Sequence, residues 1–215
     1  MDRNTTKALN WALIALGFGV AAWLSPRLPE LVPTHWDARG HVNGYVRKPL
    51  GVYILPMTML GVHALLAALP RMSPRGFEIA PFGRVYELLH TATLGFLLFI
   101  TVLALRAAAG DHVPILQATC VAIGLLLIVI GNFLGKVRRN FFVGIRTPWT
   151  LANDEVWLRT HRLGGKTFVL AGVVVVAGVC LGASVAQCTF VAVLAALVPA
   201  VYSYVVYRRL EHRSH

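Results

Sequence analysis

Residues 140–166 read NFFVGIRTPWTLANDEVWLRTHRLGGK and lie between two long apolar runs. The segment places charged side chains among several aromatic ones, so it cannot itself cross a bilayer. A plain connection between two membrane spans needs only a turn, and functional residues concentrate in connections that carry more than a turn requires. This segment is therefore the first place to look for function, and the apolar runs around it determine the fold.

The apolar runs indicate a membrane protein. Of the 215 residues, 57% are hydrophobic and 13% are charged, whereas about a quarter of the residues of a soluble protein are charged. The runs long enough to cross roughly 30 Å of hydrocarbon lie at residues 8–24, 51–69, 88–105, 113–134, 168–186 and 189–207. We expect an all-α polytopic membrane protein with six transmembrane helices in a single membrane domain, residues 1–215. The first run resembles a signal peptide but lacks a clear cleavage site, so we keep it as a mature helix.

The distribution of basic residues predicts the orientation. With six spans, 15 of the 20 Lys and Arg residues fall on one side of the membrane, and this side is expected to be cytoplasmic. The termini and a motif loop at 135–166 then lie in the cytoplasm, and residues 25–50 form an extracytoplasmic loop rich in turn-forming residues. The net charge of +11 is spread over short loops, which favours attraction to anionic lipid headgroups over binding of nucleic acid.

A short amphipathic helix is expected inside the motif loop, between the fourth and fifth spans. Thr150 or Asn153 is a suitable N-cap, and Gly164-Gly165 is a suitable end. Such a helix would lie along the inner membrane surface.

Side chains four residues apart share a face of that helix. Glu155 and Arg159 can form an ion pair, and Trp157 and His161 share another face. Trp149 and Trp157 are expected to sit at the level of the lipid headgroups, with a peptide or partner groove as the alternative. For His161 a hydrogen-bonded interfacial histidine is favoured over a metal ligand, because the segment offers no second ligand at a suitable spacing.

Arg146 is the strongest candidate for ligand binding in the segment. It stands beside the rigid Thr147-Pro148 pair and can hold a carboxylate, a phosphate or a peptide carbonyl in two-point geometry. The alternative is structural: Arg146 pairs with Asp154 or Glu155, or with a lipid phosphate, and so fixes the loop.

The extracytoplasmic loop offers a possible zinc site. His35, Asp37 and His41 supply two imidazoles and a carboxylate, although their spacing matches no common metal motif and these residue types also form turns. Otherwise no cofactor is expected.

Few polar groups lie inside the spans. For His63, Gln117 and Asn132 we favour interhelical hydrogen bonding over a role in a pathway. The spans contain no Asp or Glu, and no recognised catalytic motif is present. The sequence therefore favours a protein that is not an enzyme.

Several ordered positions resemble the SdpI family, whose members are immunity proteins against Sdp-type toxins. The resemblance rests on Gly131-Asn132, Gly144-Ile145-Arg146-Thr147-Pro148-Trp149-Thr150, Val156-Trp157 and Thr160-His161-Arg162-Leu163-Gly164-Gly165-Lys166, and extends upstream to Pro33-Thr34-His35-Trp36, Gly40, Gly44-Tyr45 and Lys48. It implies a multi-pass protein of the bacterial inner membrane that gives resistance to a secreted peptide toxin and sequesters a cytoplasmic transcriptional repressor at the membrane.

The resemblance and the residue types together define a candidate partner-binding set. Its members are Asn132, Arg146, Thr147, Pro148, Trp149, Glu155, Trp157, Arg159, His161 and Arg162. The expected partners are the toxin, the repressor and membrane lipids. Two alternatives stay open from the residues alone: a metal-dependent membrane enzyme using His35, Asp37 and His41, and a small-molecule or lipid transporter, against which the scarcity of embedded charge speaks.

Overall fold

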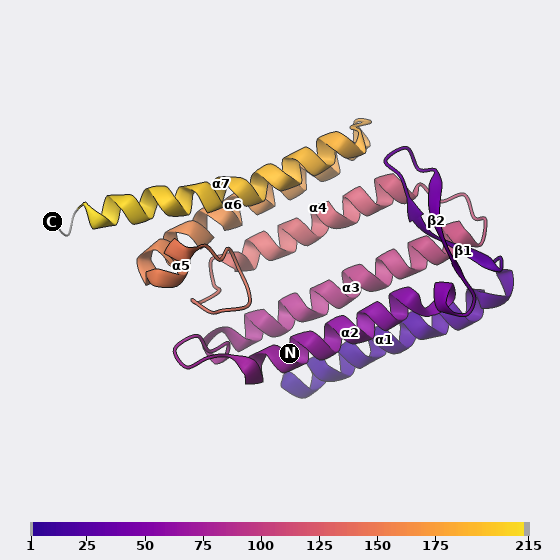
Figure 1. The fold of residues 1–215 in the computed structure, drawn as a ribbon, viewed down its shortest axis with the longest axis horizontal. Coiled ribbons are helices and arrows are strands. Elements are labelled where there is room, and N and C mark those ends of the chain that lie inside the picture. The colour runs from indigo at the N-terminus through magenta and orange to yellow at the C-terminus, as the bar shows by residue number, and fades with distance from the viewer. Residues whose placement is uncertain (1, 213–215) are drawn as a thin grey trace. The chain divides into compact units, whose positions relative to one another are not determined.

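A computed structural model describes residues 2–212, and within them six helices are long and apolar enough to cross a membrane (Figure 1). These helices are α1 (Arg3–Leu24), α2 (Leu50–Met72), α3 (Gly83–Ala108), α4 (Ile115–Leu134), α6 (Asp154–Cys180) and α7 (Val185–Glu211). The shorter elements are η1 (Ser25–Arg27), β1 (Leu31–Trp36), β2 (Val42–Arg47), η2 (Ala80–Phe82) and α5 (Pro148–Ala152). The predicted all-α fold with six spanning helices is confirmed.

The chain divides into two compact units. One unit runs up to Ala67 and includes His90–Ala122, and the other contains Ala68–Leu89 and the chain from Ile123 onward. Helices α2, α3 and α4 each contribute residues to both units. The single membrane domain expected from the sequence stays a prediction.

The first unit is built around an apolar cluster that joins its helices to a β-hairpin. The buried members are Ala21, Leu24, Leu28, Val32, Val52, Leu105 and Ala108. Strands β1 and β2 pair antiparallel, with Leu31 opposite Arg47. The sequence predicts only turns here, and this is corrected: Val32 is buried in the cluster, and packing of one strand face against helices is what gives a two-stranded hairpin its stability.

In the second unit α6 and α7 pack side by side as an antiparallel hairpin (Figure 1). The expected spans at residues 168–186 and 189–207 leave only Gln187 and Cys188 for the turn between them, and this position is wrong by a few residues. The hydroxyl of Ser184 accepts from the backbone N–H of Gln187, and the Gln187 side chain accepts from the backbone N–H of Ser184. This capping box starts α7 at Val185 and places both residues inside its first turn.

Helix α6 is continuous through Gly164-Gly165, so the predicted end of a separate amphipathic helix at these glycines is wrong. The two glycines are needed for packing instead. A Cβ on Gly165 would lie 2.8 Å from the carbonyl oxygen of Gly131, and one on Gly131 would lie 2.7 Å from the carbonyl oxygen of Gly165. The short helix between the fourth and fifth spans is α5, five residues long.

A second glycine pair lies along the same contact. A Cβ on Gly172 would lie 2.6 Å from Cγ1 of Ile128 and closer still to the carbonyl oxygen of Gly124. Because Gly124 and Gly131 are two turns apart on α4 and their partners are two turns apart on antiparallel α6, the backbones approach closely along a continuous seam.

The seam makes a prediction about stability. Gly172→Ala is expected to lower the midpoint of thermal unfolding in detergent, with a cost on the order of 1–3 kcal/mol from overpacking, because the nearest obstructing atom is the backbone carbonyl oxygen of Gly124. The matched control is Gly95→Ala in α3, where a Cβ would meet nothing within 4 Å. Intrinsic tryptophan fluorescence measures both midpoints, and equal midpoints for the two variants would contradict a close-packed seam.

Candidate functional site

The connector between α4 and α6, residues 135–153, is held by a buried asparagine. The Oδ1 atom of Asn140 accepts from the backbone N–H groups of Phe142 and Val143, at 2.8 and 2.7 Å. Its Nδ2 donates to the carbonyl oxygens of Arg138 and Val143, at 2.9 and 2.8 Å. Asn140 is fully buried, so one side chain satisfies backbone groups that lie outside any helix or strand.

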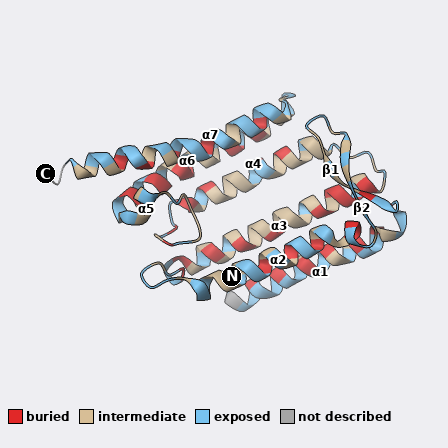
Figure 2. Ribbon diagram, viewed as in Figure 1, coloured by how far each residue is buried: buried red, intermediate tan, exposed pale blue. Residues whose placement is uncertain are grey.

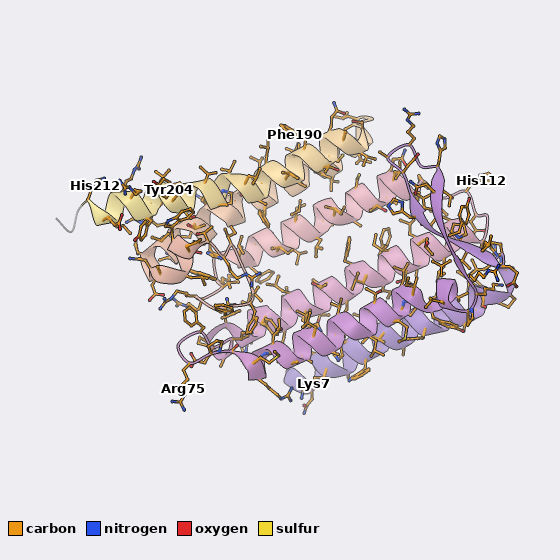
Figure 3. All side chains as sticks on the ribbon, viewed as in Figure 1. Lys7, Arg75, His112, Phe190, Tyr204 and His212 are labelled. Atoms are coloured by element: carbon orange, nitrogen blue, oxygen red, sulfur yellow. The ribbon has the colours of Figure 1, made fainter. Side chains whose placement is uncertain are left out.

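The second half of the connector is fixed by two threonines. Thr147 caps α5 in a reciprocal arrangement with Thr150: its Oγ1 accepts from the Thr150 N–H, and Thr150 Oγ1 accepts from the Thr147 N–H at 2.9 Å. The Thr147 hydroxyl also lies 3.0 Å from that of Ser203 on α7. Trp149 packs against Tyr204, with ring centroids 5.0 Å apart, where α5 meets α7. Figure 3 labels Tyr204 on α7. These contacts bind α5 to the α6–α7 hairpin.

The start of α6 follows the sequence-based expectation. Asn153 is its N-cap, with Oδ1 accepting from the backbone N–H groups of Glu155 and Val156. Glu155 and Arg159 form the predicted ion pair, with Oε1 and Nε 2.7 Å apart.

The imidazole of His161 joins the connector to α6. Its Nε2 accepts from the backbone N–H of Ile145 at 3.0 Å, and its Nδ1 donates to the carbonyl oxygen of Trp157 at 2.8 Å. Because an amide N–H only donates and a carbonyl only accepts, these bonds specify the neutral tautomer with the proton on Nδ1. The ring is fully buried. His161 is thus hydrogen-bonded, as the sequence favoured, and both nitrogens are occupied.

Trp157 completes this arrangement. Its indole stacks on the His161 ring with centroids 3.9 Å apart, and its Nε1 donates to the carbonyl oxygen of Val137 at 2.8 Å. Gly144 fits beneath the imidazole: its φ is +115°, and a Cβ there would overlap the His161 Nε2. The expectation that Trp157 anchors at the headgroups is therefore wrong, because the indole is 3% exposed.

Arg146 does not form the structural ion pair that the sequence offered as one alternative. Its Nη1 donates to the carbonyl oxygen of Phe141 at 2.8 Å, while the residue itself is exposed. Asp154 pairs instead with Arg139, whose Nε lies 2.6 Å from Oδ1. Arg146 thus stands at the surface of a connector that other residues hold.

The sequence-based candidates fall into two groups. Thr147, Trp157 and His161 hold the connector, and Trp149 packs on α7. The residues exposed on the surface are Asn132, Arg146, Pro148, Glu155, Arg159 and Arg162. Figure 2 shows buried and exposed stretches alternating along the helices.

Two of the polar residues in the spans depart from the favoured interhelical bonding. Asn132 is exposed and donates to the Ile128 carbonyl in its own helix at 2.8 Å, and Gln117 is exposed. His63 does bond across helices, with Nδ1 3.1 Å from Nε2 of His90.

Sequence reasoning missed Asn140, Thr150 as a buried bridge, and Ser203. Asn140 carried a usable signal, since Asn side chains commonly bond to backbone groups two or three residues ahead. Ser203 carried none, because a lone serine in an apolar helix does not reveal which distant hydroxyl it faces.

The structure does not form the metal site suggested for the extracytoplasmic loop. His35 Nδ1 is hydrogen-bonded to Asn43 Oδ1, and the side chain of Asp37 accepts from the backbone N–H groups of Arg39 and His41. These amides, His41 first, hold the pKa of the Asp37 carboxyl below its usual value. Among residues 2–212 no three His, Cys, Asp or Glu side chains gather closely enough to bind a metal ion. The candidate ligands instead shape the turn of the β-hairpin.

The connector from residue 136 onward, including α5, and the whole of α6 fall in one matched family region. The model of the SdpI/YfhL protein family matches residues 136–206. This part of the chain is similar to the SdpI/YfhL protein family. The match begins two residues after the end of α4 and includes all the residues that hold the connector, whereas Asn132 precedes it. A domain of unknown function, DUF1648, matches residues 12–60, which include the β-hairpin.

The chain is also similar to a curated protein over most of its length. The chain is 29% identical over 166 residues to the Immunity protein SdpI of Bacillus subtilis (strain 168), which is 76% of each protein. No solved structure matches the chain. The six apolar helices and this similarity support a multi-pass membrane protein.

The hydrogen bonds of Asn140 lead to a prediction. Asn140→Ala leaves two carbonyls and two amides without their partner in a buried site, and each such loss costs about 1–3 kcal/mol. We expect a clear fall in the unfolding midpoint of the detergent-purified protein. The control is Asn4→Ala, at an exposed position of α1. Unchanged stability of Asn140→Ala would show that the connector is held by other contacts.

Proposed function

We propose that this protein protects a bacterial cell from a secreted antimicrobial peptide toxin, without enzymatic chemistry. The observation that carries the proposal is the similarity to the Immunity protein SdpI over 76% of both chains. The structure supports it through the connector, which lies in the matched SdpI/YfhL region and whose buried polar groups are committed to holding its own backbone. Such a connector is suited to presenting a fixed surface to another molecule.

Within this proposal the two sides of the membrane have different roles. The distribution of Lys and Arg favours a cytoplasmic connector and an extracytoplasmic β-hairpin. The β-hairpin and the adjoining helix ends then meet the toxin. The exposed side chains Arg146, Glu155 and Arg159 face the cytoplasm and form the surface for a transcriptional repressor held at the membrane.

Arg146 is the best residue with which to test the proposal. Its guanidinium bonds only one described carbonyl, that of Phe141, so Arg146→Ala is expected to leave the amount of folded protein in the membrane nearly unchanged while protection is lost. The assay is survival of a toxin-sensitive bacterium challenged with an Sdp-type peptide, at equal membrane levels. The matched control is Arg75→Ala, at another exposed arginine in a loop of the same predicted side.

The outcomes separate three cases. Loss of protection with normal membrane levels supports a binding surface at Arg146. Loss of folded protein assigns Arg146 to the structure of the connector and removes this surface from the mechanism. Absence of protection from well-expressed wild-type protein contradicts immunity against this class of peptide.

The orientation has its own prediction. In a variant without native cysteines, Arg39→Cys at the tip of the β-hairpin is expected to react with a membrane-impermeant maleimide in intact cells. Arg75→Cys, equally exposed, is expected to react only after the inner membrane is made permeable. The reverse pattern would place the connector outside the cell and exclude a cytoplasmic partner for it.

A further inference from the structure

One flank of the α4–α6 seam gathers polar and basic side chains from both helices. Gly135, just past α4, lies beside Arg162: a Cβ on this glycine would be 3.9 Å from Cα and Cγ of Arg162. On the opposite flank, a Cβ on Gly164 would be 3.0 Å from Leu134 Cδ2. Gly135 and Gly164 thus mark opposite flanks of the α4–α6 contact, and helical periodicity assigns the neighbouring side chains of each helix to one flank or the other.

Residues one turn apart extend the first flank in each direction. Lys166 lies one turn after Arg162 on α6. Asn132 lies in the last turn of α4, and Lys136 lies next to Gly135 in the turn that follows α4. All four side chains belong to exposed residues. Asn132, Lys136, Arg162 and Lys166 therefore form a single strip, which we call the basic flank.

The three cations of the basic flank have no recorded acidic partner within residues 2–212. The nearby basic residues differ, because Arg159 is paired with Glu155 and Arg139 with Asp154. Lys136 has only the ring of Phe133, 4.9 Å from Nζ to the centroid. Three neighbouring cations, two on α6 and one in the turn after α4, with no anion between them among residues 2–212, repel one another unless an external anion binds.

The position of the basic flank relative to the apolar parts of α4 and α6 indicates which kind of anion it binds. Lys166 is the last charged residue of α6 before an uncharged stretch that runs to Cys180, and α4 contains no charged residue before Lys136. Both positions mark the boundary between hydrocarbon and headgroups. A phosphate of the bilayer lies at this depth, whereas a soluble anion has to compete with it there.

An apolar surface continues the basic flank into the membrane. Leu170 follows Lys166 by one turn and Val173 follows on the same side, while Leu125 lies on the matching side of α4. These three side chains are 65%, 50% and 52% exposed. The seam thus offers cations at headgroup depth above an apolar face that suits acyl chains.

We propose that the basic flank is a binding site for an anionic phospholipid. Lys136, Arg162 and Lys166 bind the phosphate and the anionic headgroup. The Asn132 amide donates one N–H to the Ile128 carbonyl and keeps a second N–H and its oxygen for the headgroup. The acyl chains lie on Leu125, Leu170 and Val173. The site is independent of the proposed immunity, since no toxin or repressor contact enters the argument.

The test measures lipid binding by the full-length protein purified in a neutral detergent. Dioleoylphosphatidylglycerol, dioleoylphosphatidylcholine and inorganic phosphate are titrated separately, with the unfolding midpoint and native mass spectrometry as readouts. We expect phosphatidylglycerol to raise the midpoint and give a one-lipid adduct, and the other two to do neither. Lys136→Gln, Arg162→Gln and Lys166→Gln are each expected to weaken phosphatidylglycerol binding by about fivefold, the effect of one basic residue near an anionic surface.

The matched control is Arg75→Gln, which removes the same charge from an exposed loop. If this variant weakens binding as much as the three site variants do, the attraction is general and the site is overturned. Equal binding of phosphatidylcholine or of inorganic phosphate also overturns it. Lys166→Arg keeps the charge and is expected to bind as wild type; monodisperse elution of all variants shows that they are folded, and wild-type affinity in the three Gln variants rejects the proposal.

Discussion

The hydrogen bond from the Ile145 backbone to the His161 imidazole is the contact on which the rest of the connector depends. It is the point where a segment without regular structure meets α6, and it places the ring against Trp157 on one side and Gly144 on the other. The ring is buried and neutral in this arrangement, so the contact has the directionality of a polar bond without the cost of a buried charge. Position 144 must then be glycine.

The buried polar side chains of the connector act as substitutes for secondary structure. A chain that leaves one membrane helix and enters another exposes amides and carbonyls that neither helix can satisfy. Asn140 serves the first half of the connector, Thr147 and Thr150 serve α5, and Asn153 starts α6. Because short side chains perform this task, the long basic side chains are left at the surface.

The sequence was sufficient for the features that depend on one-dimensional patterns. Six apolar runs predicted six helices, Asn153 was identifiable as an N-cap, and spacing of four residues predicted the Glu155–Arg159 pair. The sequence was not sufficient where a local structure depends on packing between segments that are distant in the chain. Two consecutive glycines such as Gly164-Gly165 are typical of a helix end. Here α6 continues through them, and their lack of side chains lets α4 pack closely against α6. Tryptophan is a residue type typical of interfacial anchors. Trp157 is buried instead, because its indole donates to the Val137 carbonyl and stacks on the His161 ring. The arrangement of His35 and His41 is set by strand pairing and turn hydrogen bonds, which their spacing in the sequence does not reveal.

The glycine seam links the two functional inferences through one constraint. Close approach of α4 and α6 requires glycine at the points of contact. The side chains that face lipid or the headgroups therefore come from the residues on either side of these glycines. On one flank Leu134 of α4 and Ile145 of the connector pack around Gly164. On the other flank are Asn132, Lys136, Arg162 and Lys166. The same backbone contact therefore positions the apolar side chains beneath the connector and the basic flank beside it. A substitution that separates α4 from α6 is expected to affect both the connector and the basic flank.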